Sequence, residues 1–186
     1  EHEDVFKSEA VASPTVWRES QQVQHLELGI AENNLFLNLA SLGLAHDLFG
    51  ARLLPVGTLY DPFINRGLDA LIYACYQGAR FLLVATPSGI SLAPEGGAHQ
   101  SIGTPLIGIS QPGLTAFEPA YADELAVIMR WALAHLQEPD GSAVYLRLTT
   151  RQIEQPKRDI TPAGVIEGGY WLQQPAPDAE LALVFA

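Results

Sequence analysis

The chain has 186 residues and a mass of 20.1 kDa, which is enough for one domain of ordinary size and a remainder. Apolar residues make up 48% of it and charged residues 17%, a globular composition that excludes a disordered or collagen-like chain. The 21 acidic and 10 basic side chains give a formal net charge of −11, and because such a surface repels phosphate groups we expect neither nucleic acid nor a membrane as a partner.

Helical and strand patterns alternate along the chain. Residues 1–22 form a polar lead-in without periodicity. Apolar residues at helical spacing predict helices over residues 26–44, 62–76 and 121–136. Apolar runs of strand length predict strands over residues 52–58, 81–85, 114–117, 143–148 and 180–186. The run 81–85 is apolar throughout, which is typical of a central parallel strand that is covered on both faces.

This alternation predicts the fold class and the domain organisation. Strands that alternate with helices of this length imply βαβ units, so we expect an α/β fold with a mainly parallel sheet sandwiched by helices. The domain is expected to span residues 23–150. Residues 151–186 are rich in proline and glycine and end in a strand pattern, which predicts a linker and the first strand of a truncated C-terminal domain.

Glu32 lies among apolar residues in the first predicted helix. At 100° per residue it shares one side of that helix with Leu28, Leu35, Phe36 and Leu39. Burial disfavours the charged form of a carboxylate, so such a group is paired, protonated or retained for chemistry. Two interpretations stay open on the pattern alone: a satisfied core carboxylate or helix cap, and a catalytic acid.

Two further stretches hold candidate site residues. Residues 86–113 contain six glycines and four prolines, which is typical of a functional loop with one short helix. Within it Glu95 and His99 flank glycines that allow close approach to a ligand, although such polar pairs are also typical of a solvated turn. Tyr60 and Phe63 lie where a strand gives way to a helix, and they either wall a pocket for a flat heterocycle or pack in the core.

Cysteine and histidine usage bounds the remaining chemistry. The single cysteine, Cys75, excludes an internal disulfide and a thiolate zinc cage, and its apolar neighbours favour a small buried hydrophobe. The five histidines are scattered without ligand spacing, so the residues indicate no metal site. The first residues lack the pattern of a signal peptide, and no apolar run reaches the ~18 residues that span a bilayer. The sequence therefore predicts a cytoplasmic protein.

Five stretches, taken in order, resemble one family. They are residues 26–34 (LELGIAENN), 57–63 (GTLYDPF), 86–89 (TPSG), 95–100 (EGGAHQ) and 117–121 (FEPAY). Their order and spacing over about residues 23–150 resemble the pyrimidine-binding domain of the transketolase superfamily. The likeness is greatest to the thiamine-diphosphate-dependent, decarboxylating component of homodimeric, bacterial-type pyruvate dehydrogenase complexes. The resemblance implies a parallel-sheet α/β sandwich whose first strand lies upstream of residue 1.

The resemblance also implies roles for the candidate residues. The acid at the position of Glu32 contacts the aminopyrimidine ring of thiamine diphosphate and shares a proton with it, which activates the cofactor. Tyr60 and Phe63 match the aromatic positions around that ring. His99 matches an active-site histidine that hydrogen-bonds the substrate or moves protons, and Glu95 lies near it on the substrate side.

One family motif is absent from this chain. The residues that hold the diphosphate and Mg²⁺, Gly-Asp-Gly with a later Asn, do not occur in it, and in the family they lie in a preceding domain. We therefore expect the Mg²⁺ ligands outside this chain and only half of a site within it. The second subunit of a homodimer is expected to supply the other half, and the isolated fragment is expected to be inactive.

The resemblance implies a fragment of a 2-oxo acid dehydrogenase. It would decarboxylate pyruvate and pass the acetyl group to a lipoyl-bearing acyltransferase component. A transketolase-like ketol transferase, with the same Glu32 chemistry acting on sugar phosphates, is an open alternative. A non-catalytic module that keeps the fold for subunit contacts is another.

Overall fold

The computed structural model describes residues 20–21 and 24–184, and the chain divides into two compact units, residues 1–30 and 31–186. In the described part of the first unit there is no helix or strand, and Nε2 of His25 lies 3.3 Å from Oε1 of Glu27. The predicted lead-in over residues 1–22 lies almost entirely outside the described residues. Every described helix and strand belongs to the second unit.

Four short strands of the second unit form one parallel sheet. They are β1 (Val56–Leu59), β2 (Leu82–Ala85), β3 (Leu114–Phe117) and β4 (Ala143–Arg147). Their order in the sheet is β1-β2-β4-β3, and each neighbouring pair is parallel. The two inner strands, β2 and β4, are almost entirely buried. The predicted α/β class and the central place of the run 81–85 are therefore confirmed.

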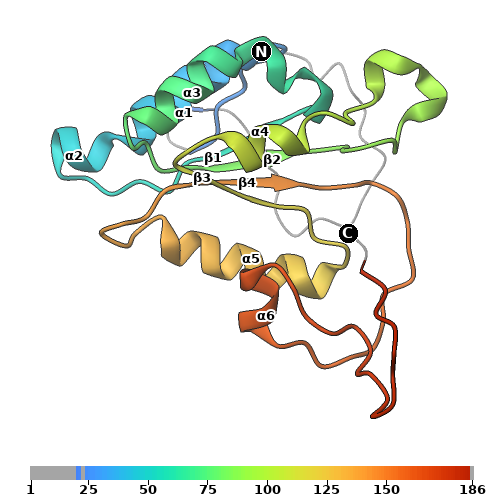
Figure 1. Ribbon diagram of the computed structural model, residues 1–186. Coiled ribbons are helices and arrows are strands. Elements are labelled where there is room, and N and C mark those ends of the chain that lie inside the picture. Colours follow the sequence, from blue (N-terminus) through green and yellow to red (C-terminus); the bar gives the residue numbers. More distant parts are fainter. Residues whose placement is uncertain (1–19, 22–23, 185–186) are drawn as a thin grey trace. The chain divides into compact units, whose positions relative to one another are not determined.

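Helices cover both faces of this sheet (Figure 1). On one face lie α1 (Glu32–Gly43), α3 (Leu68–Tyr76) and the short α4 (Pro105–Ser110). On the other lie α5 (Ala122–His135) and α6 (Pro162–Glu167). The second unit is thus a sandwich of helices, sheet and helices.

Two apolar clusters fill the spaces between sheet and helices. One includes Leu83 of β2 with Phe36 of α1, and the other includes Leu82 of β2 with Ile128 of α5. Successive side chains of β2 thus enter opposite clusters, as the period-two alternation of a strand requires. A strand that is apolar at every position is stable only when both of its faces are covered.

Four more short helical segments complete the described elements. They are α2 (Ala45–Phe49) and the 3₁₀ segments η1 (Asp61–Gly67), η2 (Ala93–Glu95) and η3 (Gly97–His99). Together η1 and α3 occupy the predicted helix over residues 62–76, with Pro62 in the first turn of η1. The loop over residues 86–113 holds η2, η3 and α4 where one short helix was expected.

The predicted helix over residues 26–44 is wrong at its start. Residues 26–31 are not helical, and α1 begins at Glu32 because Gly29 takes a left-handed φ of +65° that no right-handed helix contains. Leu28 therefore lies outside the apolar stripe, which consists of Leu35, Phe36 and Leu39. Glu32 lies in the first turn of α1 rather than in the middle of a buried helix face.

The strand predicted over residues 180–186 is not formed in its described part. Residues 180–184 form no strand and their apolar side chains are exposed, whereas residues 185–186 lie outside the described part. A strand is stabilised by a hydrogen-bonded neighbour, and an apolar run without one has no ladder to join. The sequence analysis also missed α6, which is only six residues long and contains Pro162 and Gly164.

Two further features agree with or extend the sequence analysis. Cys75 of α3 is buried in the apolar cluster that includes Leu83 and Phe36, which confirms the expected small hydrophobe, and burial raises the pKa of its thiol to about 11. Among residues 20–21 and 24–184, no helix combines the length and the apolar character needed to cross a bilayer.

A cluster of charged and polar side chains around the buried Glu124 attaches the segment after residue 151 to α5. The guanidinium of Arg158 donates to both carboxylate oxygens of Asp123 at 3.0 Å and to Oε1 of Glu124 at 2.6 Å. The hydroxyl of Tyr170 also donates to Glu124, whose other oxygen accepts from the backbone N–H of Ala120 at 2.8 Å. Arg158 lowers the pKa of Asp123. Burial opposes that direction at Glu124, but the hydrogen bonds outweigh it and lower the pKa of Glu124 as well.

We expect acid to release this segment. A carboxyl group with a lowered pKa in the folded state stabilises that state above its ordinary pKa of about 4, and this stabilisation is lost as the pH falls through the lowered value. Limited proteolysis with an acid-active protease should therefore cleave residues 151–170 much faster at pH 3 than at pH 6. Arg158→Gln should be cleaved fast at both pH values. If the cleavage rate depended on pH equally in the variant and in the parent chain, the ion cluster around Arg158 would not be what holds this segment.

Candidate functional site

The predicted site residues lie around the carboxyl end of β1. Tyr60 directly follows β1, and Phe63 belongs to η1, which continues from it. Glu32 begins α1, which packs against η1. Polar and aromatic groups gather here because the carboxyl ends of parallel strands open onto one edge of the sheet, where α/β folds bind ligands.

Tyr60, Phe63 and His99 form a compact group. The rings of Tyr60 and Phe63 meet edge to face, with centroids 5.0 Å apart and an interplanar angle of 88°. The hydroxyl of Tyr60 lies 2.9 Å from Nδ1 of His99, which is hydrogen-bond distance. Residues 39 positions apart are thus joined directly. The structure brings the aromatic pair and the loop histidine to one place.

Arg66 connects this group to Glu32, and the sequence analysis missed it. Its Nη1 lies 3.7 Å from Oε1 of Glu32, and its guanidinium carbon lies 3.6 Å from the centre of the Phe63 ring. The side chain of Glu32 is 12% exposed, whereas that of Arg66 is 52% exposed. A signal was present in the sequence, since Arg66 follows Phe63 by three residues and is the only base between residues 53 and 79.

Gly67 explains why η1 can approach the start of α1. A Cβ at this position would lie 2.5 Å from Cδ2 of Phe36 and 2.9 Å from the backbone oxygen of Glu32. Any larger residue would push η1 and α1 apart. The glycine therefore allows the close approach that brings Arg66 and Phe63 beside Glu32.

Glu95 lies near the group without joining its hydrogen bonds. It is exposed at the end of η2. Burial raises the pKa of the Tyr60 hydroxyl, and the negative charge of Glu95 raises it further. At neutral pH the hydroxyl of Tyr60 therefore keeps its proton beside His99.

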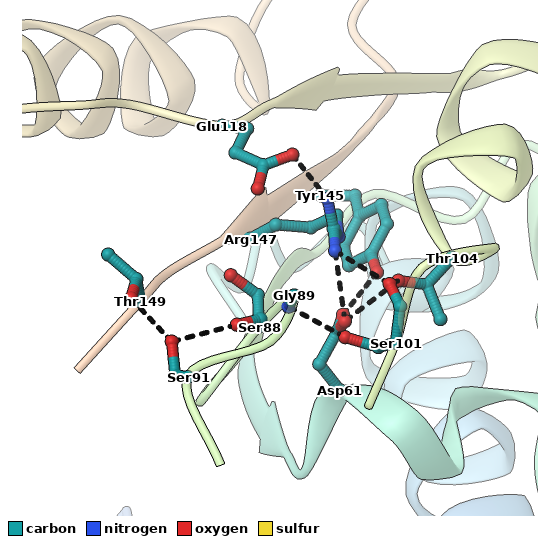
Figure 2. A network of polar contacts seen from close by, with 10 residues as sticks. All are labelled: Asp61, Ser88, Gly89, Ser91, Ser101, Thr104, Glu118, Tyr145, Arg147 and Thr149. Carbon is teal, nitrogen blue, oxygen red and sulfur yellow. Dashed lines mark hydrogen bonds and ion pairs between the residues drawn. The ribbon is translucent and has the colours of Figure 1, made fainter. Parts of the chain in front are cut away.

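A second polar cluster, whose centre at Asp61 is fully buried, adjoins this group and was also missed (Figure 2). Asp61 has no exposed surface, and it accepts hydrogen bonds from Tyr145, Thr104 and Arg147 at 2.6, 2.7 and 3.3 Å. Arg147 also pairs with Glu118. The available signal was the presence of a cation inside the otherwise apolar strand run 143–148.

The described residues offer no evident metal centre. Among them, no three or more histidine, cysteine or acidic side chains are grouped closely enough to hold an ion. The chemistry available at the group is that of one partly buried carboxyl, two aromatic rings and one imidazole.

Comparison with known proteins adds a family and a set of relatives. Residues 2–154 match the family described as transketolase, pyrimidine binding domain. A pyruvate dehydrogenase E1 component from Mycobacterium tuberculosis is 28% identical over 160 residues, which are 83% of this chain and 17% of that protein. A 6-deoxy-6-sulfo-D-fructose transketolase subunit from a Clostridium species is 28% identical over 148 residues, which are 77% of this chain and 42% of that protein.

Solved structures show the same fold. A transketolase from Leishmania mexicana superimposes with a TM-score of 0.63 and 25% identity, over 74% of this chain and 19% of the other. The chain thus corresponds to less than half of the length of each of these relatives. The sequence-based expectation of a pyrimidine-binding domain of the transketolase superfamily is confirmed.

Proposed function

Because the chain belongs to the family of transketolase pyrimidine-binding domains, we propose that it binds the aminopyrimidine ring of thiamine diphosphate within a larger enzyme. The family match over residues 2–154 carries this proposal. The domain itself is proposed to span residues 23–150, with a linker after it.

The residues around β1 fit the pyrimidine half of this cofactor. A flat heterocycle with ring nitrogens needs aromatic surface and a carboxyl group, and Tyr60, Phe63 and Glu32 provide both. Within the described residues the carboxyl of Glu32 approaches only Arg66, at 3.7 Å, which is too long for a hydrogen bond. Its oxygens are therefore available to a ligand.

The chain's residues do not fit the diphosphate half. A magnesium ion needs several oxygen ligands, and no group of three candidate ligands is present in the part of the chain that the structure describes. We propose that Mg²⁺ and the diphosphate are held by a preceding domain, in the second subunit of a homodimer.

Each residue of the group then has a proposed task. Thiamine diphosphate, when bound, supplies a carbon nucleophile for attack on a carbonyl group. Glu32 shares a proton with a ring nitrogen of the pyrimidine, while Tyr60 and Phe63 pack against that ring. His99 and Glu95 act on the substrate side, where an imidazole can donate or accept a proton.

We propose that the complete enzyme is a 2-oxo acid dehydrogenase that uses pyruvate and passes the acetyl group to a lipoyl-bearing acyltransferase in the cytoplasm. Support comes from the relatives named as pyruvate dehydrogenase E1 components, which include proteins of Mycobacterium tuberculosis and Pseudomonas aeruginosa. The test is an assay of the complete enzyme with Mg²⁺ and thiamine diphosphate. Turnover of pyruvate with a lipoyl acceptor supports the proposal, and absence of that turnover contradicts it.

A ketol transferase is the second candidate. The Clostridium transketolase subunit and the Leishmania transketolase support it, since both are similar to this chain at 25–28% identity. Ketose phosphate offered to the same complete enzyme separates the two reactions. Inactivity toward both substrates, with no cofactor bound, would favour the non-catalytic module.

We expect this chain alone to bind thiamine diphosphate weakly. The strong, charge-assisted contacts to the diphosphate and Mg²⁺ are absent, and the pyrimidine contacts remain. Calorimetry should show no micromolar binding and no dependence on Mg²⁺. Thiamine without its diphosphate is the matched control, and its affinity should be similar because the missing residues do not concern it. Micromolar, Mg²⁺-dependent binding would contradict the proposal that this chain holds only half of the cofactor site.

A further inference from the structure

The buried cluster around Asp61 joins segments that are far apart in the sequence. The sheet register pairs Leu59 with Ala85 and Ala85 with Arg147, so that the ends of β1, β2 and β4 lie in one row. Asp61 follows β1 by two residues, and Nη2 of Arg147 reaches its Oδ2 at 3.3 Å. The side chain of Arg147 is 4% exposed and that of Asp61 is fully buried. The pair thus fixes the segment next to Tyr60 onto the central strand β4.

The same guanidinium holds the loop that carries His99. Nη2 of Arg147 donates to the backbone oxygen of Ser101 at 3.1 Å, and Nη1 pairs with Glu118 after β3. Figure 2 shows Arg147 between Glu118 on one side and Asp61 with Ser101 on the other. One planar group therefore spans three segments, a geometry that a guanidinium provides and an ammonium does not.

Ser101 is the base of a closed loop. Its hydroxyl accepts from the backbone N–H of Gly89 at 2.8 Å, and its own N–H donates to the oxygen of Gly89 at 3.0 Å. The start of the loop is also attached to the end of β4, since the N–H of Ser88 donates to the oxygen of Leu148 at 2.9 Å. His99 lies inside this loop, two residues before Ser101. Fixing the base of the loop consequently limits where the imidazole can lie.

Burial of this pair is costly and indicates a positional role. Two charges removed from water are often no more stabilising than well-packed apolar residues of similar size. What the pair provides, and apolar packing would not, is a defined geometry between the segment of Tyr60 and the loop of His99. The 2.9 Å hydrogen bond between the side chains of Tyr60 and His99 connects this segment to this loop.

We propose that Asp61 and Arg147 are positioning residues that hold the Tyr60–His99 hydrogen bond and thereby select one tautomer of His99. In the tautomer that we propose, the Tyr60 hydroxyl donates to Nδ1 of the neutral imidazole across the 2.9 Å contact, and the imidazole proton is carried on Nε2. His99 presents an N–H donor on its free side. The inference rests on the proposed function only in treating His99 as a site residue.

The test is the side-chain ¹⁵N NMR spectrum of His99 in the full, ligand-free chain at a pH where the imidazole is neutral. We expect the Nε2–H tautomer in the parent chain. Tyr60→Phe, which removes the donor, should lower the tautomer ratio by roughly five- to tenfold. Arg147→Lys keeps the charge but loses the three-way contact, and Asp61→Asn keeps the shape but loses the charge. Both should lower the ratio toward that of Tyr60→Phe.

Two controls separate positioning from general stability. Asp123→Asn weakens a different ion cluster, on α5, and should reduce the melting temperature without changing the His99 spectrum. Thr104→Val removes a hydroxyl that donates to Asp61 at 2.7 Å and to the backbone oxygen of Ser101 at 3.0 Å, and it should give a smaller change in the same direction. If Arg147→Lys and Asp61→Asn do not fold, Thr104→Val decides the matter.

An unchanged His99 spectrum in any folded variant of Arg147 or Asp61, or in Thr104→Val if neither of those folds, would overturn the proposal. The same holds if the parent chain shows mainly the Nδ1–H tautomer. Because the measurement needs no cofactor, it can fail while the complete enzyme still uses thiamine diphosphate. Conversely, a spectrum with the Nε2–H tautomer in the parent chain and a lower tautomer ratio in the variants would support the proposal even if the assays of the complete enzyme failed.

Discussion

Glu32→Gln in the complete enzyme should lower turnover by roughly a hundredfold or more at saturating thiamine diphosphate, because an amide cannot share the proton that a carboxyl shares. The substitution keeps the size of the side chain. Glu32 lies in the first turn of α1 with no hydrogen bond to the other described residues, so its loss leaves no buried partner unsatisfied. The fold should survive, and the loss should appear in kcat.

The matched control is Glu167→Gln at the end of α6. This carboxylate is exposed, lies on the opposite face of the sheet from α1, and undergoes the same chemical change. Its turnover should equal that of the parent enzyme. Melting temperature and circular dichroism of both variants check that the fold is retained. Near-normal turnover of Glu32→Gln would assign Glu32 to a structural role at the start of α1.

The main elements of the fold could be predicted because their signals are local. An apolar run of strand length defines β2, and helical spacing of apolar residues over 121–136 defines α5. The boundaries were less accurate where one backbone angle decided them. Gly29 ends the periodic pattern by its positive φ, and nothing in the spacing of Leu28 and Glu32 indicates that the helix starts only at Glu32.

The candidate site could be predicted only in part. Resemblance indicated Glu32, Tyr60, Phe63 and His99, and the structure places Phe63 and His99 each in direct contact with Tyr60. Their roles toward cofactor and substrate stay predictions. What the sequence could not indicate are contacts set by strand register. Asp61 and Arg147 are 86 residues apart, and they meet only because β1, β2 and β4 are aligned in parallel.

Arg66 was missed for a different physical reason. Its contact with Glu32 depends on the close packing of η1 against α1, which Gly67 permits. A guanidinium over an aromatic face gains from the electrostatic attraction between the cation and the ring. On an isolated helical pattern, however, the same arginine is indistinguishable from a solvated surface residue. The close approach at Gly67, and not the arginine itself, makes the contact.

His99→Ala in the complete enzyme should lower turnover by about 10² to 10⁴, the usual loss for one positioned acid or base group. The loss should fall on steps after substrate entry. His99 lies on the closed loop and contacts the Tyr60 hydroxyl, whereas the proton-sharing group proposed for the cofactor is Glu32, whose ion-pair partner Arg66 lies over the Phe63 ring. Hydrogen/deuterium exchange at C2 of the bound thiamine diphosphate separates cofactor activation from the steps after substrate entry, because it reports cofactor activation without substrate.

In His99→Ala the exchange at C2 should stay near that of the parent enzyme while turnover falls, and in Glu32→Gln both should fall. If exchange in His99→Ala falls as far as turnover, His99 acts on cofactor activation or on assembly of the site, and the substrate-side role is wrong.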